Sequence, residues 1–393
     1  MDTFTHAVSG ALLYKTWTAF SPRSLGPATR WALPLAMVVA AAPDVDIFFA
    51  PSPVDFLLLH RGITHSLAAL PLLAGLMALF MYPLWRKSTP RAWSFAQTYA
   101  LALSLFALHI YLDCITTYGT MIFLPFSDYR VRFNGMFIID IWLLIPMILA
   151  CCCIPTNCAR MVTGSPPWHQ ARRAFLFTAC AWMVLYPAST ILWRQQIEGQ
   201  ELLRLADQAP FSPTVLPDAL SPLHWRILYA TEAAAPQLET PLQLKASALP
   251  PSGGEYGTVH QQGLNGLAEP TSRTYAYPAA DPNLVAQLSA LDRGCKVFFR
   301  FTLLPLQYTQ TWEGGSEYLF YDLRFNTLVP FVRKLMALRR DGQIPFLLRA
   351  RFDSNGTLVA LRMSFSGSNR DSGWYTPEAP HPPTWAQWLV GLR

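Results

Sequence analysis

Long apolar runs fill the first half of the chain, whereas the second half mixes short apolar stretches with polar and proline-rich segments. Five runs are each long enough for a helix that crosses a bilayer core of about 30 Å, which takes about 20 residues. They lie near residues 31–50, 63–85, 92–115, 136–155 and 174–193. A sixth run, near residues 5–20, is shorter, because a helix from His6 to Phe20 rises only about 21 Å. We therefore predict an all-α polytopic membrane domain of about six helices.

Composition supports this division of the chain. Of the 393 residues, 52% are apolar and only 14% are charged, whereas roughly 25% of the residues of a soluble protein are charged. We assign residues 1–194 to the membrane domain, residues 195–222 to a linker and residues 223–393 to a soluble domain. Four prolines between residues 209 and 222 predict that the linker is stiff.

The soluble domain has weaker patterns of both helix and strand. Val297-Phe-Phe-Arg-Phe-Thr302 alternates weakly, and residues 326–340 have the pattern of a basic helix. The runs 347–352 and 358–365 flank Asn355-Gly356, and this dipeptide between such runs indicates a β-hairpin. We predict a small α+β domain that contains no nucleotide-binding loop, zinc knuckle or nucleophile elbow. We expect no nucleic-acid partner.

The short loops alternate in basic content, which predicts the topology. Loops 21–30, 86–91 and 156–173 carry two or three Arg and Lys residues each. The positive-inside rule places such loops in the cytoplasm. With six spans, the C-terminal domain is then extracytoplasmic.

Ionisable residues recur at the ends of the apolar runs, and this topology places all of them at the outer face. They are His6, Asp44, Asp46, His60, His65, His109 and Asp113. Ionisable groups at membrane depth are costly, so they mark functional sites by default. Imidazoles and carboxylates together are also the ligands that a zinc-type site requires.

Two pairs in this set have more than one interpretation. His109 and Asp113 are four residues apart, so on a helix they share one face and either bind one metal ion or hydrogen-bond to each other. Asp44 and Asp46 are two residues apart and follow an apolar run. One can bind a metal while the other contacts a histidine or water, or both can be solvated at a helix end.

The segment His60-Arg61-Gly62-Ile63-Thr64-His65-Ser66 is the richest in such groups. Its imidazoles can be metal ligands or general bases, and Arg61 can hold a phosphate or carboxylate through two hydrogen bonds. A polar interfacial loop is the plainer interpretation. In a later outer loop, Asp128 and Arg130 can line a substrate cleft or form a surface ion pair.

These segments resemble the YdjM-like membrane-bound metal-dependent hydrolases, a family of the bacterial inner (cytoplasmic) membrane. The matching pieces are Thr5-His6-Ala7, Pro43-Asp44-Val45-Asp46, His60-Arg61-Gly62-Ile63-Thr64-His65-Ser66, His109-x-x-x-Asp113 with Thr116 and Gly119, and Leu124-Pro125-Phe126. The HRGxTHS element is the most specific of them. The resemblance covers the membrane half and implies a multi-pass hydrolase of the inner membrane.

The pattern is also distantly similar to zinc-dependent phospholipase C and the related single-strand nucleases, which use His, Asp, His and HxxxD in chain order. That similarity implies a ligand set of His6, Asp46, His60 or His65, His109 and Asp113. The chain lacks the later His and HxxxE ligands of that group. One or two divalent ions, with zinc expected, are therefore implied in place of three.

We expect metal-dependent hydrolysis of a phosphoester in a lipid or lipid-linked substrate at the outer face of the membrane. Asp44 or Asp46 is expected to act as a base or to orient a ligand histidine, and Arg61 or Arg130 to offset developing negative charge. The alternatives are a non-catalytic membrane protein that binds metal, and an envelope scaffold whose outer domain binds a protein partner. A transporter is disfavoured because the polar groups stop at one face.

Overall fold

The computed structural model describes most of the membrane half and parts of the remainder. The described residues are 1–20, 31–86, 94–154, 166–204, 211–219, 222, 225–231, 243–247, 260–262, 274–325, 332, 346–365 and 370–378. They form two compact units. The first contains Met1–Asp46 and Arg61–Leu192, and the second contains Ile47–His60 together with the described residues from Trp193 onward. A segment from the membrane half therefore folds with the C-terminal half.

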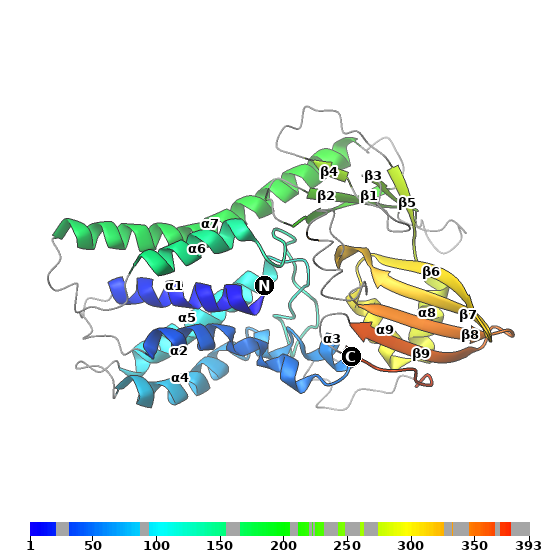
Figure 1. Cartoon of the computed structure of the whole chain (residues 1–393), viewed down its shortest axis with the longest axis horizontal. Helices are drawn as coiled ribbons and strands as arrows, with labels where there is room; N and C mark the ends of the chain where they lie inside the picture. Colours follow the sequence, from blue (N-terminus) through cyan, green and yellow to red (C-terminus); the bar gives the residue numbers. More distant parts are fainter. Residues whose placement is uncertain are drawn as a thin grey trace. The chain divides into compact units, whose positions relative to one another are not determined.

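The first unit is helical (Figure 1). Its elements are α1 (Thr3–Phe20), α2 (Ala32–Ala41), the 3₁₀ helices η1 (Ala42–Phe49, which continues into the second unit) and η2 (Ile63–His65), α4 (Leu70–Arg86), α5 (Phe95–Cys114), α6 (Ile141–Cys153) and most of α7 (Pro166–Arg204). Helix α1 contacts α2, α5 and α6, and α4 contacts α5. Gly10 permits the approach of α1 to α2, because a Cβ atom there would lie 2.4 Å from the Ala40 Cβ.

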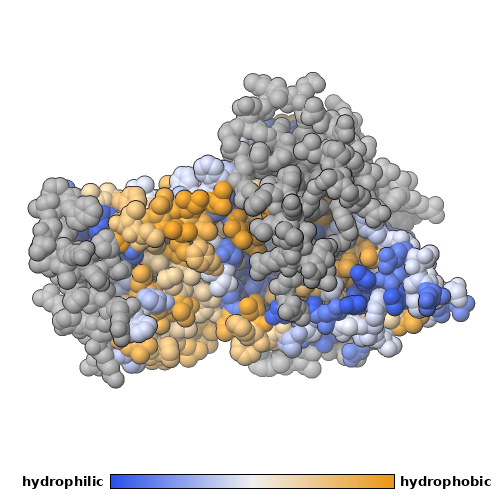
Figure 2. All heavy atoms as spheres, in the orientation of Figure 1, coloured by the Kyte–Doolittle hydropathy of each residue, from blue (hydrophilic) through white to orange (hydrophobic). Residues whose placement is uncertain are grey.

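Three helical segments among the described residues are long and apolar enough to cross a membrane: Ala32–Phe49, Phe95–Cys114 and Gln170–Leu203. A fourth span results if Pro53–His65 and Leu70–Leu84, which are bent by 78°, count as one. Each of the six predicted runs contains a helix, but the predicted number of spans is not confirmed, since α6 has only 13 residues. Hydrophobic residues predominate on the visible surface of the helical unit (Figure 2), which suits contact with lipid.

The second unit contains two antiparallel sheets. The first has the order β1-β2-β3-β5 with β4 beside β2, from β1 (Phe211–Pro217), β2 (Trp225–Thr231), β3 (Gln243–Ser247), β4 (His260–Gln262) and β5 (Thr274–Pro278). The second has the order β10-β9-β8-β7-β6, from β6 (Pro305–Trp312), β7 (Gly315–Asp322), β8 (Leu347–Asp353), β9 (Leu358–Phe365) and β10 (Arg370–Asp371). Helices α3 (Pro53–Leu59), α8 (Pro282–Leu291) and α9 (Arg293–Phe301) complete this unit.

The α+β character predicted for the C-terminal region is confirmed, including its hairpin. Strands β8 and β9 pair in antiparallel register on either side of Asn355-Gly356. Gly356 has φ of 77°, a left-handed conformation that glycine adopts without steric cost. The buried Phe298 of α9, and Leu348 and Met363 of the two strands, belong to the core of this unit.

Two predictions for the C-terminal region are wrong. The segment 195–222 is not a linker throughout, because α7 extends to Arg204 and residues 211–217 form strand β1. Its prolines are compatible with a strand because β1 lies at the edge of its sheet, where a missing N–H costs no ladder hydrogen bond. The weakly alternating segment 297–302 is not a strand but lies largely in helix α9. The predicted helix 326–340 lies outside the described residues, apart from residue 332.

Candidate metal centre

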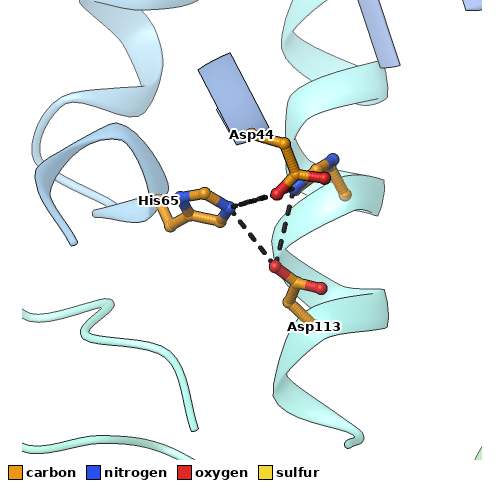
Figure 3. Close-up of side chains that lie close together, drawn as sticks. Asp44, His65 and Asp113 are labelled. Carbon is orange, nitrogen blue, oxygen red and sulfur yellow. Dashed lines mark hydrogen bonds and ion pairs between the residues drawn. The ribbon is translucent and has the colours of Figure 1, made fainter. Parts of the chain in front are cut away.

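Four buried side chains from three elements of the first unit converge on one point. Asp44 comes from η1, His65 from η2 and Asp113 from α5 (Figure 3). His109 also comes from α5. One ligand atom from each lies within 4.8 Å of all the others. The two Nε2 atoms of the histidines are 3.0 Å apart. Each lies 3.6 Å from Asp44 Oδ1, and they lie 3.3 and 3.5 Å from Asp113 Oδ2.

Helix α5 supplies two of the four groups through its own periodicity. It begins at a capping box in which Ser94 and Gln97 satisfy each other's backbone N–H groups. The helix then runs without interruption to Cys114. His109 and Asp113 therefore lie one turn apart on the same face, which was the arrangement predicted from their spacing, and both are buried.

The hydrogen bond at Nδ1 of His109 determines which of the two ring nitrogens carries the proton. Its Nδ1 lies 2.7 Å from the Ala40 carbonyl oxygen at the end of α2. A 3₁₀ turn would pair that carbonyl with residue 43, and Pro43 has no N–H to donate. Because a carbonyl can only accept, Nδ1 of the neutral ring donates the hydrogen bond and Nε2 presents a lone pair.

His65 is oriented in the same way by different partners. Its Nδ1 lies 2.9 Å from Thr64 Oγ1 and 3.3 Å from Asp46 Oδ2. The Thr64 hydroxyl donates to the same Asp46 oxygen at 2.9 Å. Both partners can therefore accept from the imidazole, so Nδ1 donates and Nε2 again presents a lone pair. The two aspartates of the Pro43-Asp44-Val45-Asp46 segment thus lie at the two different nitrogens of one ring.

The convergence of these atoms is what a cation requires. Two imidazole lone pairs and two carboxylate oxygens face one another in a buried space, and Asp113 Oδ2 accepts no hydrogen bond from the described residues. Without a positive charge between them, these atoms would repel one another. Four ligand atoms placed tetrahedrally at about 2.1 Å from one zinc ion are roughly 3.4 Å apart. The five separations given above span 3.0 to 3.6 Å.

The other oxygen of Asp113 is surrounded by hydrogen-bond donors. Asp113 Oδ1 lies 2.9 Å from an Arg61 guanidinium nitrogen and 3.1 Å from His6 Nε2, and it also contacts the Met1 amino group. The carboxylate therefore has one fully satisfied oxygen and one oxygen that faces the four-residue group. This arrangement holds the carboxylate in a fixed orientation.

Arg61 is a structural partner of the group in this structure. Its guanidinium is buried, donates to the Thr116 hydroxyl at 2.9 Å and lies 4.8 Å from the Tyr118 ring centroid. Its backbone N–H donates to Asp46 Oδ2 at 3.0 Å. The residue has φ of 59°, a conformation that is uncommon for a non-glycine residue. Its contacts with both Asp113 and Asp46 differ from the predicted contact with a substrate phosphate.

The remaining predicted residues lie at different distances from the group. The ring of His6 stacks on that of His109 with centroids 3.7 Å apart, so His6 is adjacent to the four ligand atoms but not one of the four residues. The half-buried Arg130 lies 5.8 Å from the Tyr118 ring centroid and donates to the Gly119 carbonyl. His60 ends α3 in the second unit, with its ring 4.8 Å from that of Phe56.

The structure places the two aspartates differently. Asp44, one of the two residues expected as a base or an orienting residue, belongs to the group that can hold a metal, whereas Asp46, which the distant resemblance implied as a ligand, contacts Nδ1 of His65. Of the two histidines in the HRGITHS segment, His65 belongs to this group. Sequence reasoning did not identify Thr64, Tyr118 or the Ala40 carbonyl as participants. The only local signal for the Ala40 carbonyl was Pro43, because this proline has no N–H to donate to that carbonyl in a 3₁₀ turn.

Comparison with known proteins gives a family match for the first half of the chain. Residues 1–197 match the YdjM inner membrane protein family. The uncharacterized protein YfhP of Bacillus subtilis (strain 168) is 30% identical to the chain over 129 residues, which are 32% of this chain and 38% of that protein. The match thus spans well under half of that relative. No solved structure matches the chain.

Proposed function

This chain belongs to the YdjM inner membrane protein family, and from that premise we propose that it is a membrane-bound, metal-dependent hydrolase. Its family and its candidate spans support a membrane location. The observation that carries the proposal is the convergence of four possible ligand atoms, from Asp44, His65, His109 and Asp113, within 4.8 Å of one another. Hydrolase activity itself is the proposed part, and so are the substrate and the identity of the metal.

The donor set fits a divalent transition metal. Two imidazole nitrogens and two carboxylate oxygens suit Zn²⁺, and they also suit ions such as Mn²⁺ or Fe²⁺ that accept six ligands. A four-coordinate zinc ion would use all four protein atoms, whereas an ion with five or six ligands leaves positions for a water or a substrate oxygen. Such an ion would polarise a substrate oxygen and lower the pKa of a water molecule. If all four protein atoms bind the ion, hydrolysis therefore requires an ion with five or six ligands, so that a water or a substrate oxygen can bind as well.

A lipid phosphoester is the substrate class that we propose. The Asp44 side chain is 9% exposed while those of the other three residues are fully buried, which supports substrate access from the η1 side. The opposite face of η1 is apolar, with Val45, Phe48 and Phe49 all strongly exposed. A short helix that holds a ligand inward and exposed aromatic rings outward suits contact with a lipid. Arg130, which is half-buried, is the proposed contact for the phosphate.

The basic loops support an extracytoplasmic site. Loops 21–30, 86–91 and 156–173 carry the Arg and Lys residues that favour a cytoplasmic location. Asp44 follows the C-terminal end of α2, and Asp113 lies at the C-terminal end of α5, whereas loops 21–30 and 86–91 precede these helices in the chain. We therefore propose that the metal centre and the C-terminal region lie on the extracytoplasmic side of the inner membrane.

Metal analysis of matched histidine variants tests the proposal. We expect purified wild-type protein to hold at least one divalent ion per chain, His65→Ala to lose it, and His60→Ala to retain it. His60 is the matched control because it lies five residues away in the same segment but in the second unit. Equal metal content in both variants, or no metal in the wild type, would overturn the metal centre.

Phosphate release then separates an enzyme from a non-catalytic metal-binding protein. Metal-loaded wild type and His65→Ala are compared on a panel of phospholipids and lipid-linked phosphates in detergent. We expect release by the wild type alone. A wild type that binds metal tightly but releases no phosphate from any member of the panel would favour the alternative, a metal-binding envelope protein without phosphoesterase activity.

A further inference from the structure

The segment Ile47–His60 links the part of the chain that carries the metal centre to the second unit. The residues Ile47–His60 fold with the second unit, although they lie between Asp46 and Arg61 of the first. The two residues that flank this segment are hydrogen-bonded to each other, because the Arg61 N–H donates to Asp46 Oδ2 at 3.0 Å. The 3₁₀ helix η1 runs across the point of departure, with Asp44 near its start and Phe49 at its end.

Arg370 of strand β10 binds the far end of this helix. Its Nε donates to the Ala50 carbonyl at 2.8 Å, and one terminal guanidinium nitrogen donates to the Ile47 carbonyl at 2.6 Å. The Ile47 carbonyl also accepts from the Ala50 N–H at 3.4 Å, and a cation at the C-terminal end of a helix interacts favourably with the helix dipole. Hydrogen bonds from a charged donor are about twice as strong as neutral ones.

Helix α3, in the later part of the segment Ile47–His60, packs within the second unit. The Arg370 guanidinium also lies 4.7 Å from the Phe56 ring centroid. The Phe56 ring in turn lies 6.1 Å from that of Phe365 on β9 and 6.5 Å from that of Phe346. Helix α3, which carries Phe56, contacts both α9 and β9. Arg370 therefore contacts both the end of η1 and the aromatic cluster around Phe56.

We propose that Arg370 is a positioning residue for the metal centre, through which the C-terminal region sets the position of Asp44. The side chain binds the end of η1, and the same 3₁₀ helix carries Asp44. This inference rests on the proposed function, because it assigns Asp44 to the metal. It gives the C-terminal region a role in the site without any contact to substrate.

Hydrogen exchange and cobalt binding on the full-length protein in detergent test this role together. We expect Arg370→Ala to raise amide exchange in residues 42–50 and to weaken Co²⁺ affinity by roughly tenfold or more, as loss of an outer-shell partner does. The visible spectrum of bound Co²⁺ should change, since it reports ligand geometry. Arg370→Lys, which keeps a charged donor, should restore part of the affinity.

Arg349→Ala is the matched control, because Arg349 lies in the same sheet with its guanidinium 3.6 Å from Glu317. This variant should leave both the exchange of residues 42–50 and the Co²⁺ affinity at wild-type values. Wild-type affinity and spectrum in Arg370→Ala would overturn the inference, even if exchange rises. A wild type that binds no Co²⁺ would overturn the proposed function, and exchange of residues 42–50 would then still decide whether Arg370 holds η1.

Discussion

Asp322 of the second unit and Asp113 of the first are both fully buried carboxylates, but different atoms surround them. Both oxygens of Asp322 face hydrogens, since they accept from the Leu303 and Arg324 amides and from the Arg324 guanidinium at 2.8 to 2.9 Å. Asp113 has one oxygen of this kind. Its other oxygen faces two imidazole lone pairs and a second carboxylate.

The comparison separates structural acids from acids that can hold a metal. Burial alone does not distinguish them, because a buried carboxylate that is paired with Arg is common in folded domains. What differs is whether the surrounding atoms carry hydrogens. In the second unit the charge is satisfied by the chain itself, whereas in the first unit one carboxylate oxygen, Asp113 Oδ2, accepts no hydrogen bond from the described residues.

Replacement of each aspartate by asparagine gives the largest expected effect. Asp113→Asn and Asp322→Asn each leave a buried arginine without its carboxylate, so each should lower the free energy of unfolding by about 3–5 kcal/mol. Only Asp113→Asn should also abolish metal binding. Thermal unfolding in detergent and metal content per chain measure the two effects. Metal loss in Asp322→Asn, or full metal content in Asp113→Asn, would break the distinction.

A smaller effect is expected at Asp46, which contacts His65 on the nitrogen that faces away from the group. Asp46→Asn retains an acceptor for Thr64 but loses the charge that orients the imidazole, so metal affinity should fall by about 10- to 100-fold while saturating metal still fills the site. Titration with Co²⁺ measures this, with Asp55→Asn on α3 as the control. Complete loss of binding would instead make Asp46 a ligand, as the resemblance to known hydrolases implied.

The smallest effect is expected for the exposed pair of Arg362 and Asp371. The hydrogen bond from Arg362 lowers the pKa of Asp371 below its usual value. The pair therefore contributes stability above the unfolded-state pKa of about 3.9, and this contribution is lost as the pH falls through the lower folded-state value. Because both side chains are more than a third exposed, Asp371→Asn should cost less than about 1 kcal/mol at pH 7.

Melting temperatures of the wild type and Asp371→Asn at pH 7 and pH 3 measure this contribution. The difference between the two proteins should shrink at the lower pH and in high salt. A difference that grows as the pH falls would contradict the assigned sign. Metal content should be the same in both proteins at pH 7, which would set this pair apart from the buried carboxylates.

Spacing within a single element predicted the parts of the site that one helix supplies. His109 and Asp113 share a face because the helix period brings residues four apart together, and the i, i+4 spacing is visible in the chain. The hairpin at Asn355-Gly356 was predictable for a similar reason, because the turn chemistry is local. The β1 strand was not, since its prolines are tolerated only at a sheet edge, and an edge is a property of the whole sheet.

The sequence by itself determined the helical character of the first half, the location of the acids and histidines at helix ends, and the shared face of His109 and Asp113. Tertiary structure decided that Asp44 and not Asp46 faces the imidazole lone pairs, and that His65 joins the four-residue group while His60 folds with the second unit. The physical reason is that these choices depend on the acceptors at each Nδ1. The Ala40 carbonyl and the Thr64–Asp46 pair are brought there only when separate segments pack together.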